Sequence, residues 1–329
     1  MSNPEYITSL RRLLTEIGYR DEAAPPYDTA YWGPFHAWMF DTLGPTSSWG
    51  VKQLTELEHS SGTIIERAYP HASVQLKLLF AKLTAIAILI DDSIEDEAVY
   101  TEILQFSHKL YLGEVQQNGM LALYHDNLKE LSEVYGADAV LRGLAIVPWI
   151  NYIDACLMEK EIFTAERELA KNADMQPVCV TSGNPLKSHN SNAIHLAGLA
   201  PKFPQYLRSK SGISEAYAAC IFKSRKEQDV PLNKYIRALP DLTFFIEVMN
   251  DLLSFHKEEL AAETHNLIHL RTRSLSSSGA RGTGADGEWT RYDTLRLLCD
   301  EIIEATRRID ALFRLEECER TLRGEVGGE

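Results

Sequence analysis

The amino-acid sequence predicts an all-α fold. Apolar residues recur every three or four positions along most of the chain, which is the period of an amphipathic helix. No segment alternates apolar and polar residues as a half-buried strand does, and no turn dipeptide joins two apolar runs as in a β-hairpin. Glycine and proline stand mainly between the periodic segments, where helices end. With 329 residues, 45% of them apolar, the chain can bury a large core.

The periodic segments predict the helices in order along the chain. The first helix has its apolar face at Leu10, Leu13, Leu14 and Ile17. Ser48 is placed to cap the second helix, which continues to Ile64. An almost unbroken apolar run over residues 78–90 predicts a buried helix. Further helices are predicted over residues 103–112, 121–135, 137–158, 214–226, 231–238, 242–256 and 292–315.

Two segments lack this periodicity. Residues 174–201 are rich in Ser, Asn and Pro, and residues 274–288 have low complexity. Long aperiodic segments are unusual inside a compact domain, so we predict an insertion or loop over 174–201 and a mobile loop over 274–288. No repeat and no linker divides the chain, and residues 1–329 are therefore predicted to form one domain.

Charge and cysteine usage narrow the class of protein. The net charge of −14 argues against binding to nucleic acid or to anionic membrane surfaces. The five cysteines are scattered without a CxxC pair, as expected in a reducing compartment. The N-terminus shows no signal peptide, and the longest apolar run is too short to span a bilayer. We therefore expect a cytoplasmic protein.

Two acidic clusters far apart in the chain each follow an apolar run. The first is Asp91-Asp92-Ser93-Ile94-Glu95-Asp96, and the second begins at Asn250-Asp251 and ends at Glu258. Carboxylates that end an apolar helix repel one another and lose solvation, so they must be paired, protonated or metal-bound. Clusters that faced each other across a helical bundle could hold several hard cations, and a polyphosphate would be their natural ligand. A solvated helix surface is the alternative for either cluster alone.

The spacing within each cluster favours oxygen ligands for magnesium. Asp91 and Glu95 are four apart, which places them on one face of a continuous helix. Asn250, Ser254 and Glu258 repeat that spacing twice and present a carboxamide, a hydroxyl and a carboxylate on one face. Magnesium prefers oxygen ligands and fills its remaining positions with water and phosphate oxygens.

These residues resemble the motifs of a known family. Asp91-Asp92-Ser93-Ile94-Glu95 resembles the aspartate-rich motif of class I terpene synthases, and Asn250-Asp251-xx-Ser254-xx-Lys257-Glu258 resembles their second metal motif. Between them, the segment from Tyr206 to Tyr217, with Arg208 and Gly212, is similar to the segment that senses pyrophosphate and contains a helix break. The residues of the three motifs together are most similar to those of the fungal trichodiene synthase branch. The resemblance covers roughly residues 49–315.

The resemblance implies a single-domain helical bundle with a central active-site cavity and a sesquiterpene cyclase activity. Three Mg2+ ions would bind the diphosphate of farnesyl diphosphate and stabilise the departing pyrophosphate as Lewis acids. Aromatic faces would stabilise the carbocation, and closure would exclude water. The metal ligands implied are Asp91 with Asp92 and Glu95 from the first motif, and Asn250, Ser254 and Glu258 from the second.

The resemblance also implies residues that bind the substrate. Arg208 would bind pyrophosphate, with Ser211 and Gly212 at the helix break behind it, and Lys257 would reach a phosphate oxygen. A surface position is the alternative for Arg208 and for Lys257. Aromatic residues at helical spacing are usually part of a core, but some would line the cavity, and the candidates are Trp149, Tyr152, Phe222, Phe244 and Phe245. Formation of a homodimer is left open.

The sequence departs from the family pattern near its end. The family carries an Arg-Tyr pair on a last helix, where both residues contact pyrophosphate. Here Arg291-Tyr292 follows Asn250 too closely to match that pair. The interval between the two metal motifs is also longer than expected, and the excess lies in residues 174–201. The expectation is a chain truncated before the final helix.

Four other interpretations remain beside the sesquiterpene synthase. A truncated, inactive relative and a non-catalytic helical interaction protein both agree with the missing Arg-Tyr pair. Prenyl-chain elongation would need a second aspartate-rich motif in place of residues 250–258, which is absent. A carboxylate di-iron bundle needs two Glu-x-x-His pairs, and the chain offers Glu56 with His59 alone.

Overall fold

The structure is a computed structural model that describes residues 4–21, 26–136, 138–174, 200–223 and 230–322, with side chains described up to residue 168 in the third range and residue 315 in the last. Within these residues the regular secondary structure is helical, which confirms the all-α prediction. The contacts divide the chain into two compact units. Unit 1 comprises Met1–Arg20, Met158–Gly212 and Pro240–Glu329, and unit 2 comprises Asp21–Leu157 and Ile213–Leu239. The prediction of one domain stays a prediction.

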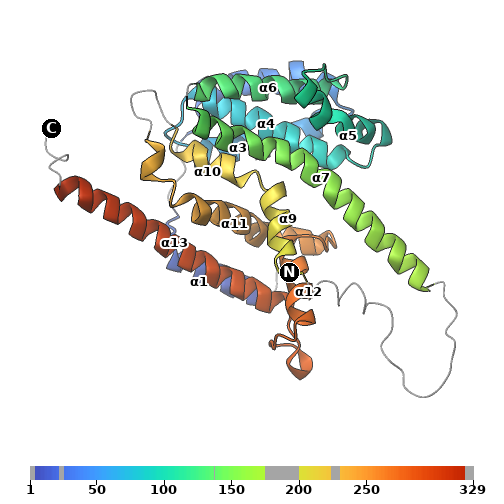
Figure 1. Ribbon diagram of the computed structural model, residues 1–329, viewed down its shortest axis with the longest axis vertical. Coiled ribbons are helices and arrows are strands. Elements are labelled where there is room, and N and C mark those ends of the chain that lie inside the picture. The colour runs from blue at the N-terminus through green and yellow to red at the C-terminus, as the bar shows by residue number, and fades with distance from the viewer. Residues whose placement is uncertain (1–3, 22–25, 137, 175–199, 224–229, 323–329) are drawn as a thin grey trace. The chain divides into compact units, whose positions relative to one another are not determined.

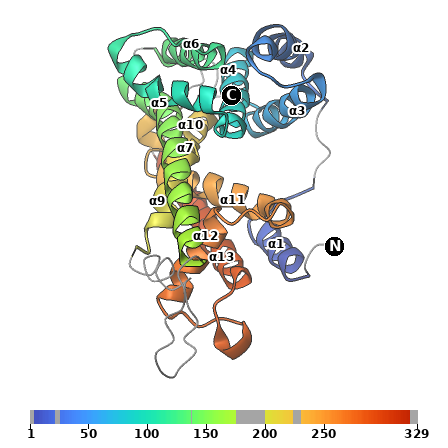
Figure 2. The ribbon, with the colours of Figure 1, turned by 90° about the vertical axis from the view of Figure 1, so that its right-hand side faces the viewer.

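Unit 2 is built around α4, which packs against α2, α3 and α6 (Figures 1 and 2). Residues 78–90 of helix α4 are almost all apolar and most of them are buried in the core, because a helix segment without a polar face has no side suited to solvent. The helices of this unit are α2 (Thr29–Trp38), α3 (Val51–Ala68), α4 (Val74–Ser93), α5 (Glu97–Leu112), α6 (Gly119–Tyr135), the first part of α7 (Ala139–Asp174) and α10 (Ser214–Ile221). A π-helical turn (Met39–Leu43) and two 3-10 turns (Gly44–Thr46 and Leu232–Lys234) complete it.

An aromatic cluster forms the centre of unit 2. It consists of Phe80, Tyr124, Trp149 and Tyr217, which come from α4, α6, α7 and α10. The Trp149 ring meets Phe80 at a centroid distance of 5.7 Å and Tyr217 at 5.5 Å, both edge to face. Edge-to-face contacts of this kind add stability beyond the area that they bury. The cluster therefore joins four helices at one point.

Unit 1 is arranged around α13, which runs alongside α1 and also packs against α12 (Figure 1). Its core joins the apolar faces of four helices through residues such as Leu13, Leu252, Ile268 and Leu298. The helices of this unit are α1 (Pro4–Glu16), α9 (Phe203–Ser211), α11 (Leu239–Leu260), α12 (Leu267–Ser277), α13 (Arg291–Leu322) and the last part of α7, with a 3-10 turn at Ala285–Gly287.

Two local predictions were wrong. The helix predicted over residues 231–238 is the single 3-10 turn Leu232–Lys234. The cap of α3 is Gly50 and not Ser48, and the Gly50 N–H donates to Gln53 Oε1 at 3.1 Å.

Helix α2 was missed at the sequence level because Gly33 and Pro34 lie inside it. The helix forms because Asp28 caps it, with Asp28 Oδ1 accepting from the Ala30 N–H at 2.9 Å, and because Tyr31 and Phe35 bury one face. Its contact with α3 is very close at Gly62, where an added Cβ would lie 2.6 Å from the Trp32 ring. Glycine is required there by space alone.

One described helix is long and apolar enough to cross a membrane by length and composition, the stretch Ala139–Glu168. This is weak evidence for a span, because the core helix of a water-soluble protein passes the same test. Trp149, Ile153 and Cys156 of this stretch are buried in the core of unit 2. Among the described residues, the cysteines Cys156, Cys220 and Cys299 are buried and form no disulfide. Most of the predicted insertion, residues 175–199, lies outside the described residues.

The predicted loop over residues 274–288 begins later than expected, because α12 continues to Ser277. Backbone hydrogen bonds tie the rest of the loop together, from Gly282 N to Gly287 O at 3.0 Å and from Gly284 N to Glu288 O at 2.9 Å. The loop ends at a capping box in which Thr290 and Asp293 bond each other's backbone N–H groups.

Asp293 also accepts hydrogen bonds from the N–H and the hydroxyl of Thr283 at 3.1 and 3.0 Å. Burial works to raise the pKa of this carboxyl, but the hydrogen bonds from Thr290 and Thr283 outweigh burial and hold the pKa well below its usual range. Its folded pKa therefore lies below the unfolded value of about 4, so its stabilising contribution is present above that pH and is lost as the pH falls.

We expect Asp293→Asn to lower the free energy of unfolding by about 1 kcal/mol at pH 7, the usual cost of losing a cap, and by less at pH 3. Urea unfolding at both pH values measures the difference from wild type. Asp286→Asn, at an exposed position of the same loop where the left-handed backbone also suits asparagine, is the matched control and should change neither value. An equal loss at pH 3 and pH 7 would contradict the role of the Asp293 carboxylate.

Candidate functional site

The first acidic cluster lies where α4 ends, in unit 2. Asp91 and Asp92 are exposed side chains in the last turn of the helix. The helix ends at Ser93, so Glu95 lies in the following turn and is not on a continuous helix face with Asp91 as expected. Asp96 has a structural role, because its Oδ1 accepts from the N–H groups of Ala98 and Val99 at the start of α5. The early helix end follows from this cap, which begins a new helix only three residues later.

Tyr152 of α7 fixes the helix turn that precedes this cluster. Its hydroxyl donates to Ala87 O at 2.8 Å, one turn before Asp91. Burial raises the pKa of the Tyr152 hydroxyl well above its usual value, and the charge of Asp91 contributes in the same direction. The hydroxyl is therefore a permanent donor, and it anchors the end of α4 that presents the two aspartates.

The second cluster lies on α11, in unit 1, and its spacing prediction is confirmed. Helix α11 is continuous over Asn250, Ser254 and Glu258, so the three side chains follow one another along one face. The Ser254 hydroxyl donates to Glu258 Oε1, and Glu258 Oε2 accepts from Asn266 Nδ2 at 2.6 Å. Asn266 is the cap of α12, so the start of that helix holds the carboxylate in place.

The chemistry of this donor set fits magnesium. A carboxamide, a hydroxyl and a carboxylate are hard oxygen donors, and Mg2+ binds such donors together with water and phosphate oxygens. Asn266 supports Glu258 from behind, as partners of metal-binding carboxylates do. No group of three or more His, Cys, Asp or Glu side chains with metal-binding geometry occurs in the described part of the chain. A set that uses Asn and Ser lies outside that class.

Arg208 of α9 contacts the second cluster directly. Its Nε donates to Asp251 Oδ2 at 2.6 Å, and its Nη2 donates to Asn250 Oδ1 at 3.1 Å and to Glu247 O at 3.2 Å. Burial works to lower the pKa of this guanidinium, but the charge and hydrogen bond of Asp251 outweigh it and raise the pKa. Burial raises the pKa of the Asp251 carboxyl, and Arg208 opposes that rise. The structure thus places a permanent cation beside a predicted metal ligand.

Glu247 and Asp251 were not among the residues predicted from the sequence. Glu247 is 1% exposed, and its Oε2 accepts from Gln205 Nε2 at 2.6 Å and from the Ser209 hydroxyl at 3.2 Å. The two acids therefore bind α9 to α11 at three positions of α9. A signal was present, because Glu247 interrupts an apolar run, and an acid buried in such a run needs a partner.

The predicted helix break after Arg208 is confirmed. Helix α9 ends at Ser211 and α10 begins at Ser214. Ile213 between them has a φ of +54°, which is unfavourable for a β-branched residue and costs on the order of 1–3 kcal/mol. At Gly212 an added Cβ would lie 2.9 Å from Arg208 Nη1 and 3.0 Å from Arg208 O. The glycine is needed because the guanidinium folds back over it.

The other candidates lie in varied surroundings. Lys257 is exposed on α11. Trp149 is fully buried in the aromatic cluster of unit 2, and Phe222 stacks on Tyr235 at a centroid distance of 3.9 Å. Phe245 is half-buried against the core of unit 1. Within unit 1 the structure therefore joins Arg208 to the second metal motif, while Trp149 and Phe222 belong to unit 2 with the first motif.

The structure weakens the di-iron interpretation. Glu56 and His59 are both exposed on α3. The buried acid of that segment is their neighbour Glu58, which bonds His36 Nδ1 at 2.9 Å. A di-iron site needs its pair to point into the core of a bundle, and this pair points to solvent.

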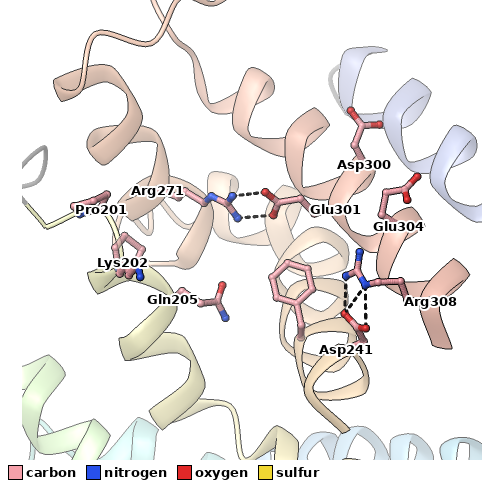
Figure 3. Close-up of a pocket in the computed structure, with 11 residues that line it drawn as sticks. Pro201, Lys202, Gln205, Asp241, Arg271, Asp300, Glu301, Glu304 and Arg308 are labelled. Atoms are coloured by element: carbon pink, nitrogen blue, oxygen red, sulfur yellow. Dashed lines mark hydrogen bonds and ion pairs between the residues drawn. The ribbon is translucent and has the colours of Figure 1, made fainter. Parts of the chain in front are cut away.

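A surface pocket of about 540 Å³ lies in unit 1 among α9, α11, α12 and α13 (Figure 3). Two arginine–carboxylate pairs cross it: Arg271 with Glu301, and Arg308 with Asp241. The candidate aromatic Phe244 lines this pocket, but none of the predicted metal ligands does. Four of its charged side chains pair across it and none of the predicted ligands lines it, so it is not the site that the two motifs indicate.

A second pocket, of about 620 Å³, lies beside the start of α13 and includes Arg291 and Tyr292. Arg291 pairs with Glu259 at 3.0 Å, and the Tyr292 ring meets Phe255 edge to face at 5.9 Å. Arg291-Tyr292, which follows Asn250 too closely to match the family pair, therefore packs on the C-terminal part of α11.

The arrangement of helices is similar to that of a solved enzyme. The linalool/nerolidol synthase from Streptomyces clavuligerus, solved in complex with 2-fluorogeranyl diphosphate, aligns with a TM-score of 0.57 over 88% of this chain and 89% of that chain, at 17% identity. The fold is that of the terpene synthases. No family model matches the sequence.

The chain is also similar in sequence to several fungal synthases of terpenes. Terpene synthase BipA of Cochliobolus sativus is 28% identical over 203 residues, covering 62% of this chain and 52% of that protein. The (E)-beta farnesene synthase of Metarhizium brunneum is 27% identical over 307 residues, covering 92% and 80%. The longiborneol synthase of Gibberella zeae is 26% identical over 253 residues, covering 76% and 62%. The chain thus spans about half the length of BipA.

Proposed function

We propose that this protein is a class I terpene synthase that ionises a prenyl diphosphate with the help of magnesium and releases pyrophosphate. The observation that carries the proposal is the joining of Arg208 to Asn250 on α11. A cation that can bind phosphate oxygens lies 3.1 Å from the first of three oxygen ligands on one helix face. The terpene synthase fold and the fungal relatives support the same class of reaction.

In this reaction the carbon–oxygen bond of the substrate breaks, and its electron pair leaves with the pyrophosphate. Magnesium, when bound, would supply Lewis-acid stabilisation of that leaving group. Asn250, Ser254 and Glu258 would hold magnesium on α11. Asp91 with Asp92 and Glu95 would hold magnesium at the end of α4. Arg208 would bind pyrophosphate oxygens through the edge of its guanidinium. The allylic cation, directly or after cyclising, loses a proton to the departing pyrophosphate to give a hydrocarbon, or captures one water and loses a proton to give an alcohol. Apolar walls exclude other water.

Several finer assignments belong to this proposal. We propose farnesyl diphosphate as the substrate, three Mg2+ ions as the cofactor, and a sesquiterpene as the product, as in the trichodiene synthase branch. Ser211, Gly212 and Lys257 would assist Arg208, and Trp149, Phe222 and Phe245 are candidates for contact with the hydrocarbon chain. A cytoplasmic location and a homodimer also stay predictions.

Purified protein incubated with farnesyl diphosphate and Mg2+ should release a hydrocarbon or alcohol together with pyrophosphate. Gas chromatography with mass spectrometry measures the first product, and a coupled phosphate assay measures the second. Excess EDTA should abolish both, because carboxylates without a cation repel the diphosphate, and added Mg2+ should restore them. Geranyl diphosphate in parallel tests chain length. Failure to convert either substrate, in protein that still binds magnesium pyrophosphate, would favour the non-catalytic alternative.

A further inference from the structure

Asp251 stands next to a predicted metal ligand but lies on another side of α11. One residue advances the helix by about 100°, so Asp251 turns away from the face of Asn250, Ser254 and Glu258. Asp251 is buried, with 5% of the residue exposed, whereas Asn250 is exposed. The Asp251 carboxylate accepts a hydrogen bond from Arg208 Nε at 2.6 Å. Asp251 is thus directed at the arginine and away from the predicted metal.

Three contacts fix the plane of the Arg208 guanidinium. Asp251 accepts a hydrogen bond from Arg208 Nε. The Arg208 Nη2 group donates to Glu247 O at 3.2 Å and to Asn250 Oδ1 at 3.1 Å. The remaining nitrogen, Nη1, lies over Gly212, where space for even one carbon is lacking. The guanidinium is planar and rigid, so the strong bond at Nε also decides where the neighbouring Nη2 group points. That group points at the carboxamide of Asn250.

The same contact fixes the orientation of the Asn250 side chain. Arginine has donors only, so the carboxamide must present its oxygen to Nη2. That oxygen has two lone pairs, one for Arg208 and one for a cation. An asparagine held in this way cannot turn its NH2 group toward the metal.

We propose that Asp251 is a positioning residue: through Arg208 it orients the Asn250 oxygen for magnesium and the guanidinium for the pyrophosphate that the magnesium holds. This rests on the proposed function of the site. Asp251 itself would touch neither metal nor pyrophosphate. Outer partners that orient metal ligands typically change metal affinity by about 10–100-fold when they are substituted.

The test measures binding of inorganic pyrophosphate in the presence of Mg2+ by isothermal titration calorimetry, with no prenyl substrate. Asp251→Asn should weaken this binding by at least about 10-fold. Asp241→Asn is the matched control, because Asp241 is also an aspartate of α11 that pairs with an arginine, Arg308, away from the motif. The control should bind as wild type does.

Loss of Asp251 leaves a buried arginine without its partner, which can unfold the protein. The double variant Arg208→Gln with Asp251→Asn removes both charges, so no buried charge is left without a partner to unfold the protein. If Asp251 acts through Arg208, the double variant should bind as weakly as Arg208→Gln alone. Thermal unfolding of the wild type and the four variants confirms that each is folded at the titration temperature.

Binding by Asp251→Asn within about twofold of wild type would overturn the proposal. So would single losses that add in the double variant, because independent residues add and coupled ones do not. The proposed function fails separately. A wild type that converts no prenyl diphosphate but shows this binding pattern would leave the role of Asp251 intact. If the wild type converts prenyl diphosphate while Asp251→Asn binds magnesium pyrophosphate normally, only the positioning role of Asp251 is overturned.

Discussion

Turnover of farnesyl diphosphate is expected to fall by more than about 100-fold in each of the variants Asp91→Ala and Asn250→Ala. The reason is that each change removes an oxygen ligand, and changes even behind the ligands cost about 10–100-fold. The magnesium concentration that gives half of the maximal rate should rise in both variants. Initial rates of pyrophosphate release over a range of Mg2+ concentrations measure both effects.

The first cluster contains its own control. Asp96 belongs to the same run of acids, but its carboxylate caps α5. Asparagine caps a helix as well as aspartate does, so Asp96→Asn should keep the fold and the rate while removing one negative charge. If Asp96→Asn and Asp91→Ala lose the same activity, the total charge of the cluster matters, and Asp91 has no specific role as a ligand.

A large loss of stability is expected from Trp149→Ala. This side chain is fully buried, and it contacts Phe80, Tyr124 and Tyr217 from three other helices. Replacing a buried tryptophan by alanine typically costs about 3–5 kcal/mol, because contacts are lost and the cavity does not close. Urea unfolding followed by circular dichroism measures the change.

Trp149→Phe separates packing from hydrogen bonding. The indole Nε1 is buried and has no hydrogen-bond acceptor among the described residues, so phenylalanine removes ring volume without breaking a bond. We expect Trp149→Phe to cost clearly less than Trp149→Ala. A normal stability of Trp149→Ala, together with altered terpene products, would instead place this ring on the wall of the substrate cavity.

The apolar period was enough to predict the helices that contribute a continuous face to a core, such as α4 and α13. It failed where tertiary contacts overrode local signals. Helix α2 forms in spite of Gly33 and Pro34 because Tyr31 and Phe35 are buried, and burial compensates for the weaker helix interior. The end of α4 at Ser93 depends on the cap at Asp96, and in the sequence Asp96 cannot be told apart from the other acids of its cluster.

The sequence predicts how the candidate ligands of α11 are spaced along the helix, but it does not predict the residues that hold them in place. The face of Asn250, Ser254 and Glu258 follows from helix geometry alone. The bond from Asp251 to Arg208 joins residues 43 positions apart in the chain, and no local pattern in the sequence contains such a partner. Asn266 behind Glu258 is a similar case, because its role depends on where α12 starts.

The pairing of Arg208 with Asp251 has a consequence for the order in which ligands bind. Without metal, the positive charge of the arginine is already balanced by Asp251, while the Glu258 side chain lies on the neighbouring face and accepts from Ser254. A free polyphosphate anion therefore meets little net attraction from α11. Each cation bound there would raise the affinity for the anion, and by thermodynamic reciprocity the anion would raise the affinity for the cation by the same factor. Under the proposed function, this helix would select the metal–polyphosphate complex, and the concentration of that complex would set the occupancy of the site.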